Sequence, residues 1–377
     1  MLRVLLDATA VPPDRGGVGR YVDAIVPELA RLAAVTVACR PSEAESFAAV
    51  GAEPVTVPAS SRGRGARLAW EQTGLVRLVR RIRPDVLHSP HYTTALRSGV
   101  PTVVTLHDAT FFSHPEVHSA VKRRFFRLAT QVAVRRADVL VVPSRATATE
   151  VARYTGAAPD AFEVAYHGVD MEVFRPVGDR ERRRVRQSLG VTGTYVGFLG
   201  TLEPRKNVSA LVRAWALAVG DRPDPPALVL AGGPGWDRAI EPAVRDATAD
   251  RPDLRVIRPG YLPLSDLPGF LSGAEVLAYP SLGEGFGLPV LEAMATGAVV
   301  LTTRMLALPE VGGDAVAYAG TSDVEIAAAL ADLLEDPARR AALASAALTR
   351  ARGFTWAASA QAHLAAYERA VFRRRSA

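Results

Sequence analysis

Short runs of β-branched and aliphatic residues alternate with longer stretches of helical periodicity along the whole chain. This order is typical of parallel sheets covered by crossover helices. The first set of predicted strands covers residues 4–8, 35–39, 86–88, 103–106, 139–142 and 163–166, and the second covers 195–199, 228–231, 255–257, 276–279, 299–302 and 316–318. Two sets of six strands predict an α/β protein with two Rossmann-like domains.

Pro and Gly interrupt this pattern at residues 174–178, just before a charged stretch, which places a hinge near residues 170–190. We therefore expect domains at residues 1–175 and 176–354, in line with roughly 100 to 200 residues per domain. The segment 355–377 has helical periodicity and no strand after it. We expect it to form a helix that packs back on the N-terminal domain.

The cysteine content and the apolar runs limit the class of protein. Cys39 is the only cysteine of the chain, which excludes a disulfide framework, a cysteine zinc site and an iron–sulfur cluster and indicates a reducing compartment. No apolar run approaches the ~20 residues that span a bilayer. Asp7 follows only three apolar residues, too soon for a signal peptide. These features predict a cytoplasmic protein.

The 45 basic residues outnumber the 39 acidic ones, but no long block of one sign is present, so no binding of nucleic acid is expected. Residues 1–175 contain 22 of the basic and 17 of the acidic side chains, which makes the N-terminal half the better candidate for an anionic partner. Lysine occurs only as Lys122 and Lys206.

The strongest local motif spans residues 280–295 and joins a predicted strand to a predicted helix. Gly285 and Gly287 expose backbone N–H groups at the helix N-terminus, an arrangement that binds anions. Glu284 and Glu292 flank these glycines, and carboxylates accept hydrogen bonds from paired hydroxyls. A ligand that combines phosphate with paired hydroxyls would match both features, and a nucleotide sugar is such a ligand. The alternative is a helix start whose glycines only allow close packing, with Glu292 on a solvated face.

A second motif, residues 200–207, follows the first strand of the C-terminal domain. Arg205 and Lys206 lie where this strand meets a helix, at the edge of an open α/β sheet that faces ligands. In a chain that nearly always uses arginine, Lys206 indicates a compact ammonium group against phosphate oxygens. The alternative is a solvated pair that caps the next helix.

The N-terminal half opens with a strand followed by glycines that include Gly17 and Gly19. A dinucleotide fingerprint would need glycine at position 22, where the chain has Val22, so a dinucleotide cofactor is disfavoured. The glycines still let a phosphate or a sugar approach the backbone. A plain turn between strand and helix is the alternative.

Six of the seven histidines fall between His88 and His167. His107 lies at the C-terminal end of a predicted strand, where it could donate a hydrogen bond to a substrate hydroxyl or stabilise developing charge. His88 and His91 are spaced loosely like metal ligands, but no third ligand motif accompanies them, and we assign both to packing at strand ends or to contacts with the acceptor.

The helix predicted over residues 121–136 is basic and aromatic, and such a helix can lie on anionic lipid. The alternative is an ordinary crossover helix that buries Phe125 and exposes its arginines.

Taken together, these motifs resemble those of the retaining glycosyltransferases of family 4, which have the GT-B architecture of two facing Rossmann-like domains with a cleft between them. The resemblance covers nearly the whole chain. It rests on the Glu284 to Glu292 motif, on residues 200–207, on residues 16–21 and on His107 with Asp108. Many members carry arginine directly after Gly200, where this chain has Thr201, which leaves Arg205 as its substitute.

The resemblance implies roles for these residues. Glu284 would face the donor hexose and Glu292 the ribose, while the amides of Gly285, Phe286, Gly287 and Leu288 would approach the sugar and the diphosphate. Arg205 and Lys206 would neutralise the departing diphosphate without a metal or another cofactor, and His107 would face the transferred sugar. Gly17 and Gly19 would lie against the donor.

The expected reaction transfers a hexose with retention, by a front-face route in which the leaving phosphate accepts the acceptor's proton. The mannosyltransferase-like branch is the nearest, which suggests GDP-mannose as donor, with UDP- or dTDP-sugars as alternatives. The acceptor is a glycan, a lipid-linked saccharide or a small molecule. A nucleotide-sugar epimerase and a non-catalytic sugar-nucleotide-binding subunit are the competing hypotheses. Replacing Glu284 or Lys206 by alanine is expected to lower turnover and leave folding intact.

Overall fold

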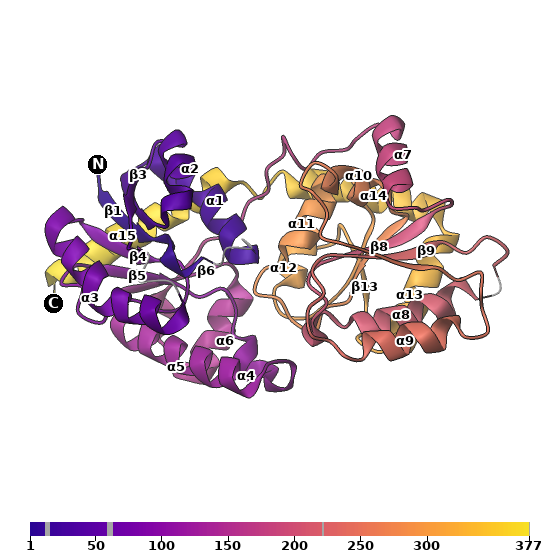
Figure 1. Ribbon diagram of the computed structural model, residues 1–377, viewed down its shortest axis with the longest axis horizontal. Helices are drawn as coiled ribbons and strands as arrows, with labels where there is room; N and C mark the ends of the chain where they lie inside the picture. The colour runs from indigo at the N-terminus through magenta and orange to yellow at the C-terminus, as the bar shows by residue number, and fades with distance from the viewer. Residues whose placement is uncertain (12–15, 59–62, 221, 377) are drawn as a thin grey trace. The chain divides into compact units, whose positions relative to one another are not determined.

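The computed structural model describes residues 1–11, 16–58, 63–220 and 222–376. The chain divides into two compact units (Figure 1): unit 1 contains Met1–Gly168 and Thr355–Ala377, and unit 2 contains Val169–Phe354. The first passage from unit 1 to unit 2 lies after Gly168, seven residues before the boundary predicted at residue 175. The two crossings of the chain lie side by side, because Val169 N donates to Phe354 O and a Cβ on Gly168 would lie 2.1 Å from the backbone nitrogen of Trp356.

Unit 1 contains a parallel sheet of seven strands in the order β3-β2-β1-β4-β5-β6-β7, one more than predicted. The missed strand β3 lies at the sheet edge and is half-exposed, so its residues form no apolar run. The central strands β4, β5 and β6 are buried along their whole length. The strands are β1 (Arg3–Asp7), β2 (Ala34–Cys39), β3 (Glu53–Thr56), β4 (Val86–Ser89), β5 (Thr102–Thr105), β6 (Val139–Val142) and β7 (Phe162–Val164).

Helices cover both faces of this sheet, which explains why its strands are apolar on both sides. Val4 packs with α1 and α15 on one face, and the next residue, Leu5, packs with α3 on the other. The helices are α1 (Gly16–Ala30), α2 (Ala44–Ala49), α3 (Arg64–Ile82), α4 (Thr110–Ser113), α5 (Ala120–Arg136), α6 (Arg145–Thr155) and α15 (Trp356–Ser376), with 3-10 turns at Ala8–Ala10, Pro41–Glu43, Pro115–Val117 and Pro159–Ala161.

Unit 2 contains a second parallel sheet, of six strands in the order β10-β9-β8-β11-β12-β13. The two sheets with their covering helices confirm the prediction of two Rossmann-like domains. The strands are β8 (Tyr195–Leu199), β9 (Ala227–Ala231), β10 (Val256–Gly260), β11 (Val276–Tyr279), β12 (Val300–Thr303) and β13 (Ala317–Ala319).

The strand order of unit 2 reverses between β8 and β11, so the segments that follow these two strands meet at one point of the sheet edge. The helices are α7 (Asp179–Ser188), α8 (Val208–Val219), α9 (Ile240–Thr248), α10 (Leu267–Gly273), α11 (Leu288–Ala295), α12 (Leu308–Gly312), α13 (Asp323–Glu335) and α14 (Pro337–Ala351), with the 3-10 turn η6 at Pro204–Lys206. None of the helices described in either unit is long and apolar enough to cross a membrane.

Candidate active site

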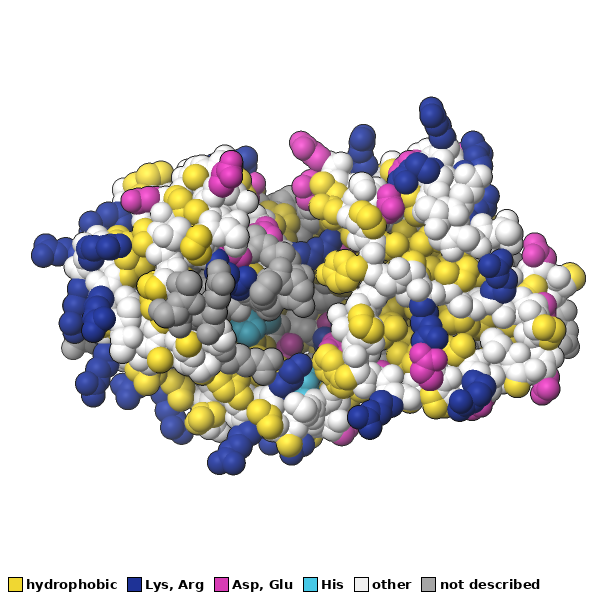
Figure 2. Space-filling view, viewed as in Figure 1, with side chains coloured by type: hydrophobic (Ala, Val, Ile, Leu, Met, Phe, Trp, Pro, Cys, Tyr) yellow, Lys and Arg dark blue, Asp and Glu magenta, His cyan; other side chains and the backbone are white. Residues whose placement is uncertain are grey.

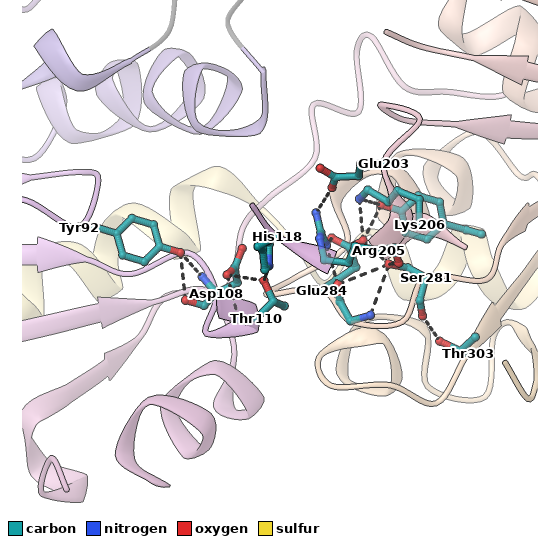
Figure 3. A network of polar contacts seen from close by, with 12 residues as sticks. Tyr92, Asp108, Thr110, His118, Glu203, Arg205, Lys206, Ser281, Glu284 and Thr303 are labelled. Carbon is teal, nitrogen blue, oxygen red and sulfur yellow. Dashed lines mark hydrogen bonds and ion pairs between the residues drawn. The ribbon is translucent and has the colours of Figure 1, made fainter. Parts of the chain in front are cut away.

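Arg205, Lys206 and Glu284 form one buried ion cluster in unit 2 (Figure 3). The two cations lie in η6, which follows β8, and the carboxylate lies in the loop that follows β11. Because β8 and β11 are neighbours where the strand order reverses, the cluster occupies the position at which open α/β sheets bind ligands. The structure thus brings together three residues that the sequence analysis placed in two separate motifs.

The carboxylate of Glu284 accepts hydrogen bonds unevenly at its two oxygens. Its Oε1 accepts from Lys206 Nζ and Ser281 Oγ, both at 2.6 Å, and from Tyr279 Oη at 3.0 Å. Its Oε2 lies 2.7 Å from Arg205 Nη1, which is its one polar contact among the described residues. Because a carboxylate oxygen accepts about two hydrogen bonds, Oε2 keeps the capacity to accept one from a ligand hydroxyl.

The electrostatics of the cluster fix the charge of Glu284. Burial alone would raise the pKa of this carboxyl, but Arg205 and Lys206 outweigh burial and lower its pKa to about 2. Burial and the neighbouring Arg205 lower the pKa of Lys206. Glu284 is therefore ionised at any physiological pH, and it can accept hydrogen bonds but cannot act as a general acid.

Tyr279 and Thr303, which help to hold this cluster in place, lie outside both predicted motifs. Lys206 Nζ also donates to Tyr279 Oη, and Thr303 Oγ1 donates to the Ser281 carbonyl at 2.6 Å. Arg205 Nη2 pairs with Glu203 at 2.6 Å. Tyr279 ends β11 and could have been found by its position beside the motif, whereas Thr303 comes from another strand and carries no local signal.

The glycine loop leads directly into helix α11, as the sequence predicts, and its binding of an anion stays a prediction. Gly287 adopts φ +100°, which favours glycine, and a Cβ there would lie 2.9 Å from Leu308 Cδ2. Gly285 and Phe286 are buried just before the helix, and Leu288 begins it. Glu292 is 4% exposed within α11, so it does not lie on a solvated face, whereas the close approach of Leu308 at Gly287 agrees with the other part of that alternative, glycines that allow close packing.

In unit 1, His107 follows β5 and is half-buried, with its ring against Tyr21 at 5.2 Å between centroids. His107 Nε2 lies 2.7 Å from the Pro90 carbonyl, which can only accept, so Nε2 carries the hydrogen. Burial lowers the pKa of His107, and the neutral ring presents Nδ1 as an acceptor. With its Nε2 hydrogen directed to Pro90, His107 has Nδ1 free only to accept, and its contact with a substrate stays a prediction.

The predicted glycines of unit 1 lie in the first turn of α1. Gly17 is exposed, and a Cβ there would meet no atom within 4 Å, whereas Gly19 is buried. The position of Gly17 leaves room for a ligand to approach the backbone. Binding of the donor at Gly17 and Gly19 stays a prediction.

Of the other two histidines at strand ends, His88 is held by hydrogen bonds and His91 packs against aromatic rings. Both ring nitrogens of His88 lie 2.9 Å from hydroxyl oxygens, those of Thr105 and Tyr367. His91 packs edge-on against Tyr92 and Phe126. Within the described parts of the chain, no group of three or more His, Cys, Asp or Glu side chains could hold a metal ion.

A second buried charge cluster, which the sequence analysis missed, lies at the C-terminal end of β1. Asp7 and Glu71 are 2% and 1% exposed, and Arg67 Nη1 lies 2.8 Å from Glu71 Oε2. Burial raises the pKa of Asp7 to about 6, although Thr9 donates to its Oδ1. Asp7 and Glu71 are far apart in sequence and belong to no motif, which is why the pattern gave no signal.

Two parallel-sheet units with covering helices are the components of the GT-B fold, and solved structures share this fold. Anabaena HepE, in complex with UDP and glucose, superposes with a TM-score of 0.75 at 21% identity and covers 97% of this chain and 98% of its own. WaaG, a glycosyltransferase of lipopolysaccharide biosynthesis, gives 0.71 at 18% identity over 96% of this chain and 98% of its own.

The family models place the chain more closely. Glycosyltransferase Family 4 matches residues 15–173 and Glycosyl transferases group 1 matches residues 193–336. D-inositol 3-phosphate glycosyltransferase of Corynebacterium diphtheriae is 30% identical over 92% of this chain and 88% of its own length. O-antigen chain mannosyltransferase B of Escherichia coli is 28% identical over 81% of this chain and 77% of its own length.

The chain belongs to glycosyltransferase family 4. It is a glycosyltransferase that uses a nucleotide sugar as co-substrate.

Proposed function

We propose that the chain is a retaining hexosyltransferase that transfers mannose from GDP-mannose to a hydroxyl acceptor and needs no metal. The buried cluster of Arg205, Lys206 and Glu284 carries this proposal. A leaving diphosphate develops negative charge, and two fixed cations in a water-poor site stabilise such charge strongly. They supply what a metal ion supplies in other transferases.

The contacts of Glu284 suggest how the donor is bound. The diphosphate accepts hydrogen bonds from Arg205 and Lys206, while Oε2 of Glu284 accepts one from a hexose hydroxyl. The amides of Gly285 to Leu288 approach the sugar and the diphosphate, and Glu292 accepts from the ribose. In unit 1, Nδ1 of His107 accepts from the transferred sugar, and Gly17 and Gly19 allow close approach of the donor.

The group transfer proceeds on one face of the sugar. The bond between the anomeric carbon and the diphosphate oxygen breaks, and the acceptor oxygen forms a bond to the same carbon on the same side. The acceptor's proton moves to the departing phosphate oxygen. Glu284 is permanently ionised and already accepts four polar contacts, which disfavours it as a covalent nucleophile.

The donor and the acceptor are inferred from the relatives. One relative is named an O-antigen chain mannosyltransferase and several are named D-inositol 3-phosphate glycosyltransferases, so mannose and a polyol or glycan hydroxyl are our first choice. A solved structure with the same fold holds UDP and glucose. UDP-sugars, and with them dTDP-sugars, are therefore our alternatives to GDP-mannose as donor. We assign the main binding site of the nucleotide sugar to unit 2 and that of the acceptor to unit 1, with Gly17, Gly19 and His107 of unit 1 as further contacts of the donor.

We also propose that the protein works in the cytoplasm with α5 against anionic lipid. Val121, Phe125 and Leu128 of α5 are 77%, 38% and 60% exposed. Basic side chains accompany them along the helix, and Figure 2 shows many Lys and Arg side chains on the visible face of unit 1. Apolar and basic groups together on one helix favour an anionic surface.

A thermal-shift screen with GDP-mannose, UDP-glucose and a dTDP-sugar tests the donor, since a ligand that binds the folded state raises its stability. If none of these donors raises the unfolding temperature, the donor assignment is contradicted.

NMR of the product then gives its anomeric configuration, and an inverted configuration contradicts retention. Donor incubated alone would yield an epimer if the chain were an epimerase. A binding subunit would shift with GDP yet never release it from GDP-mannose, and loss of activity in EDTA would contradict metal independence.

A further inference from the structure

A chain of buried polar side chains joins the C-terminal helix α15 to the rest of unit 1. Tyr21 Oη lies 2.6 Å from His363 Nε2 and 3.2 Å from Thr105 Oγ1. His88 Nε2 lies 2.9 Å from Thr105 Oγ1, and His88 Nδ1 lies 2.9 Å from Tyr367 Oη. These five side chains come from α1, β4, β5 and α15, and each is at most 1% exposed.

The hydrogen bond at His363 determines which atom donates in every other bond of this network. His363 Nδ1 lies 2.7 Å from the Ser359 carbonyl, which can only accept, so Nδ1 carries the hydrogen. Burial lowers the pKa of His363 to about 4, so the ring is neutral near pH 7. Its Nε2 is therefore an acceptor, and Tyr21 must donate to it.

The remaining bonds follow from that step. Tyr21 has given its one hydrogen to His363, so Thr105 donates to Tyr21 Oη. Thr105 in turn receives from His88 Nε2–H, and His88 Nδ1 receives from Tyr367. Every polar atom of the chain is then satisfied, and the opposite direction would require a second proton on the buried His363.

This hydrogen-bond network fixes the hydroxyl of Tyr21, and His107 packs against the ring of the same Tyr21. The ring of Tyr21 meets the His107 ring edge to face, with 5.2 Å between the two centroids. The Pro90 carbonyl holds His107 at its Nε2. Tyr21 also follows Gly17 and Gly19 in α1, within the same helix. Movement of the Tyr21 ring would therefore change the packing against His107.

We propose that Tyr21 and His363 are positioning residues: α15 holds the ring of Tyr21, and through it His107, in the orientation used for sugar transfer. This inference rests on the proposed role of His107. Neither residue touches the reacting atoms in this scheme, so their effect should appear in turnover more than in donor binding.

Histidine NMR tests the geometry without any substrate. In the full chain labelled at histidine, we expect the Nδ1–H tautomer at His363 and the Nε2–H tautomer at His88 and His107 at pH 7. Tyr21→Phe, which removes only a hydroxyl, should shift the His107 ring resonances. An Nδ1–H tautomer at His88 would overturn the directed chain, and unchanged His107 resonances in Tyr21→Phe and His363→Leu would overturn the positioning.

Kinetics test the consequence, with release of nucleoside diphosphate from GDP-mannose or UDP-glucose as the readout. His363→Leu should lower kcat about tenfold with KM for the donor changed by less than about twofold, because a small misplacement affects the reacting geometry most. His363→Gln places an acceptor near the former Nε2 and should recover most of the loss.

Ser359→Ala is the matched control on the same helix. Its hydroxyl is buried and has no partner among the described residues, and its carbonyl is kept, so kcat should not change. Equal kcat for wild type, Tyr21→Phe and His363→Leu, corrected for the folded fraction, contradicts the positioning role. If neither donor is turned over, the proposed function fails, while the NMR comparison still decides the positioning.

Discussion

Lys206 Nζ lies 2.6 Å from Glu284 Oε1, and both side chains are buried at the edge of the unit 2 sheet. Removing one partner of a buried ion pair leaves an uncompensated charge, which costs about 3–5 kcal/mol. We therefore expect Glu284→Ala to lose stability as well as turnover. This prediction differs from the expectation from sequence that folding stays intact, and unfolding of the variant distinguishes the two.

The measurement is urea unfolding alongside turnover of Glu284→Ala, Glu284→Gln and Lys206→Met. Each variant should unfold at lower urea than wild type and lose turnover by about a hundredfold, the scale of removing one group that stabilises developing charge. Arg213→Ala, which breaks the exposed pair with Asp323 in the same unit, is the control and should change stability by less than about 1 kcal/mol. Full turnover in folded Glu284→Gln would remove this residue from the site.

The low pKa of Glu284 predicts how this stability depends on pH. The folded-state pKa of about 2 is below the ordinary value of 4.5, so the stabilisation is complete above pH 4.5 and is lost as the pH falls toward 2. The difference in unfolding free energy between wild type and Glu284→Gln should stay constant from pH 5 to 8, by this linkage, and shrink below about pH 4.5. A difference that grows on acidification would contradict the pairing.

Asp7 predicts the opposite trend. Burial raises the folded-state pKa of Asp7 from 3.8 to about 6, so the folded state holds its proton more tightly and ionisation opposes folding as the pH rises through this range. Asp7→Asn keeps an oxygen for Thr9 and should be more stable than wild type at pH 8 by up to roughly 3 kcal/mol. Near pH 4 the gain should vanish. Thermal unfolding at both pH values checks this, and a destabilised Asp7→Asn at pH 8 would be the contrary result.

Gly17 and Gly287 predict contrasting effects of one added methyl group. Gly17→Ala has open space around its Cβ and should leave stability unchanged or raise it by up to about 1 kcal/mol, because alanine favours helix. If the donor lies against Gly17, turnover should nevertheless fall. Gly287→Ala should destabilise unit 2, because φ is +100° and Leu308 Cδ2 would lie 2.9 Å away. Full turnover in Gly17→Ala would place the donor elsewhere.

The exposed side of α5 predicts binding to anionic vesicles. Leu128→Glu should weaken co-sedimentation with phosphatidylglycerol vesicles, because it removes apolar contact and adds a repelled charge. Leu217→Glu is a matched control, since Leu128 and Leu217 are each 60% exposed and Leu217 lies in unit 2. Equal binding of both variants and wild type, or equal binding of wild type to neutral phosphatidylcholine, would contradict the proposed lipid contact.

The sequence predicted the fold well, because the signals of its strands are local, while the roles of the charged side chains at a site stay predictions. Strand periodicity located every strand except the half-exposed β3, and two short motifs contained Arg205, Lys206 and Glu284. The pairing of these cations with Glu284 was not predictable, because it requires η6 to lie against the loop after β11, where Leu282 N donates to Arg205 O. The bond between Tyr21 and His363 spans 342 positions and leaves no pattern in the sequence.

The two crossings at Gly168 and Thr355 also determine when each unit can be completed on the ribosome. Unit 2 is continuous, so all of its residues have been synthesised before α15 emerges. Unit 1 begins first but lacks Tyr367 and the other α15 residues of its core until the last helix is made. N-terminal domains usually finish folding first, but here the residues of unit 2 are complete before those of unit 1.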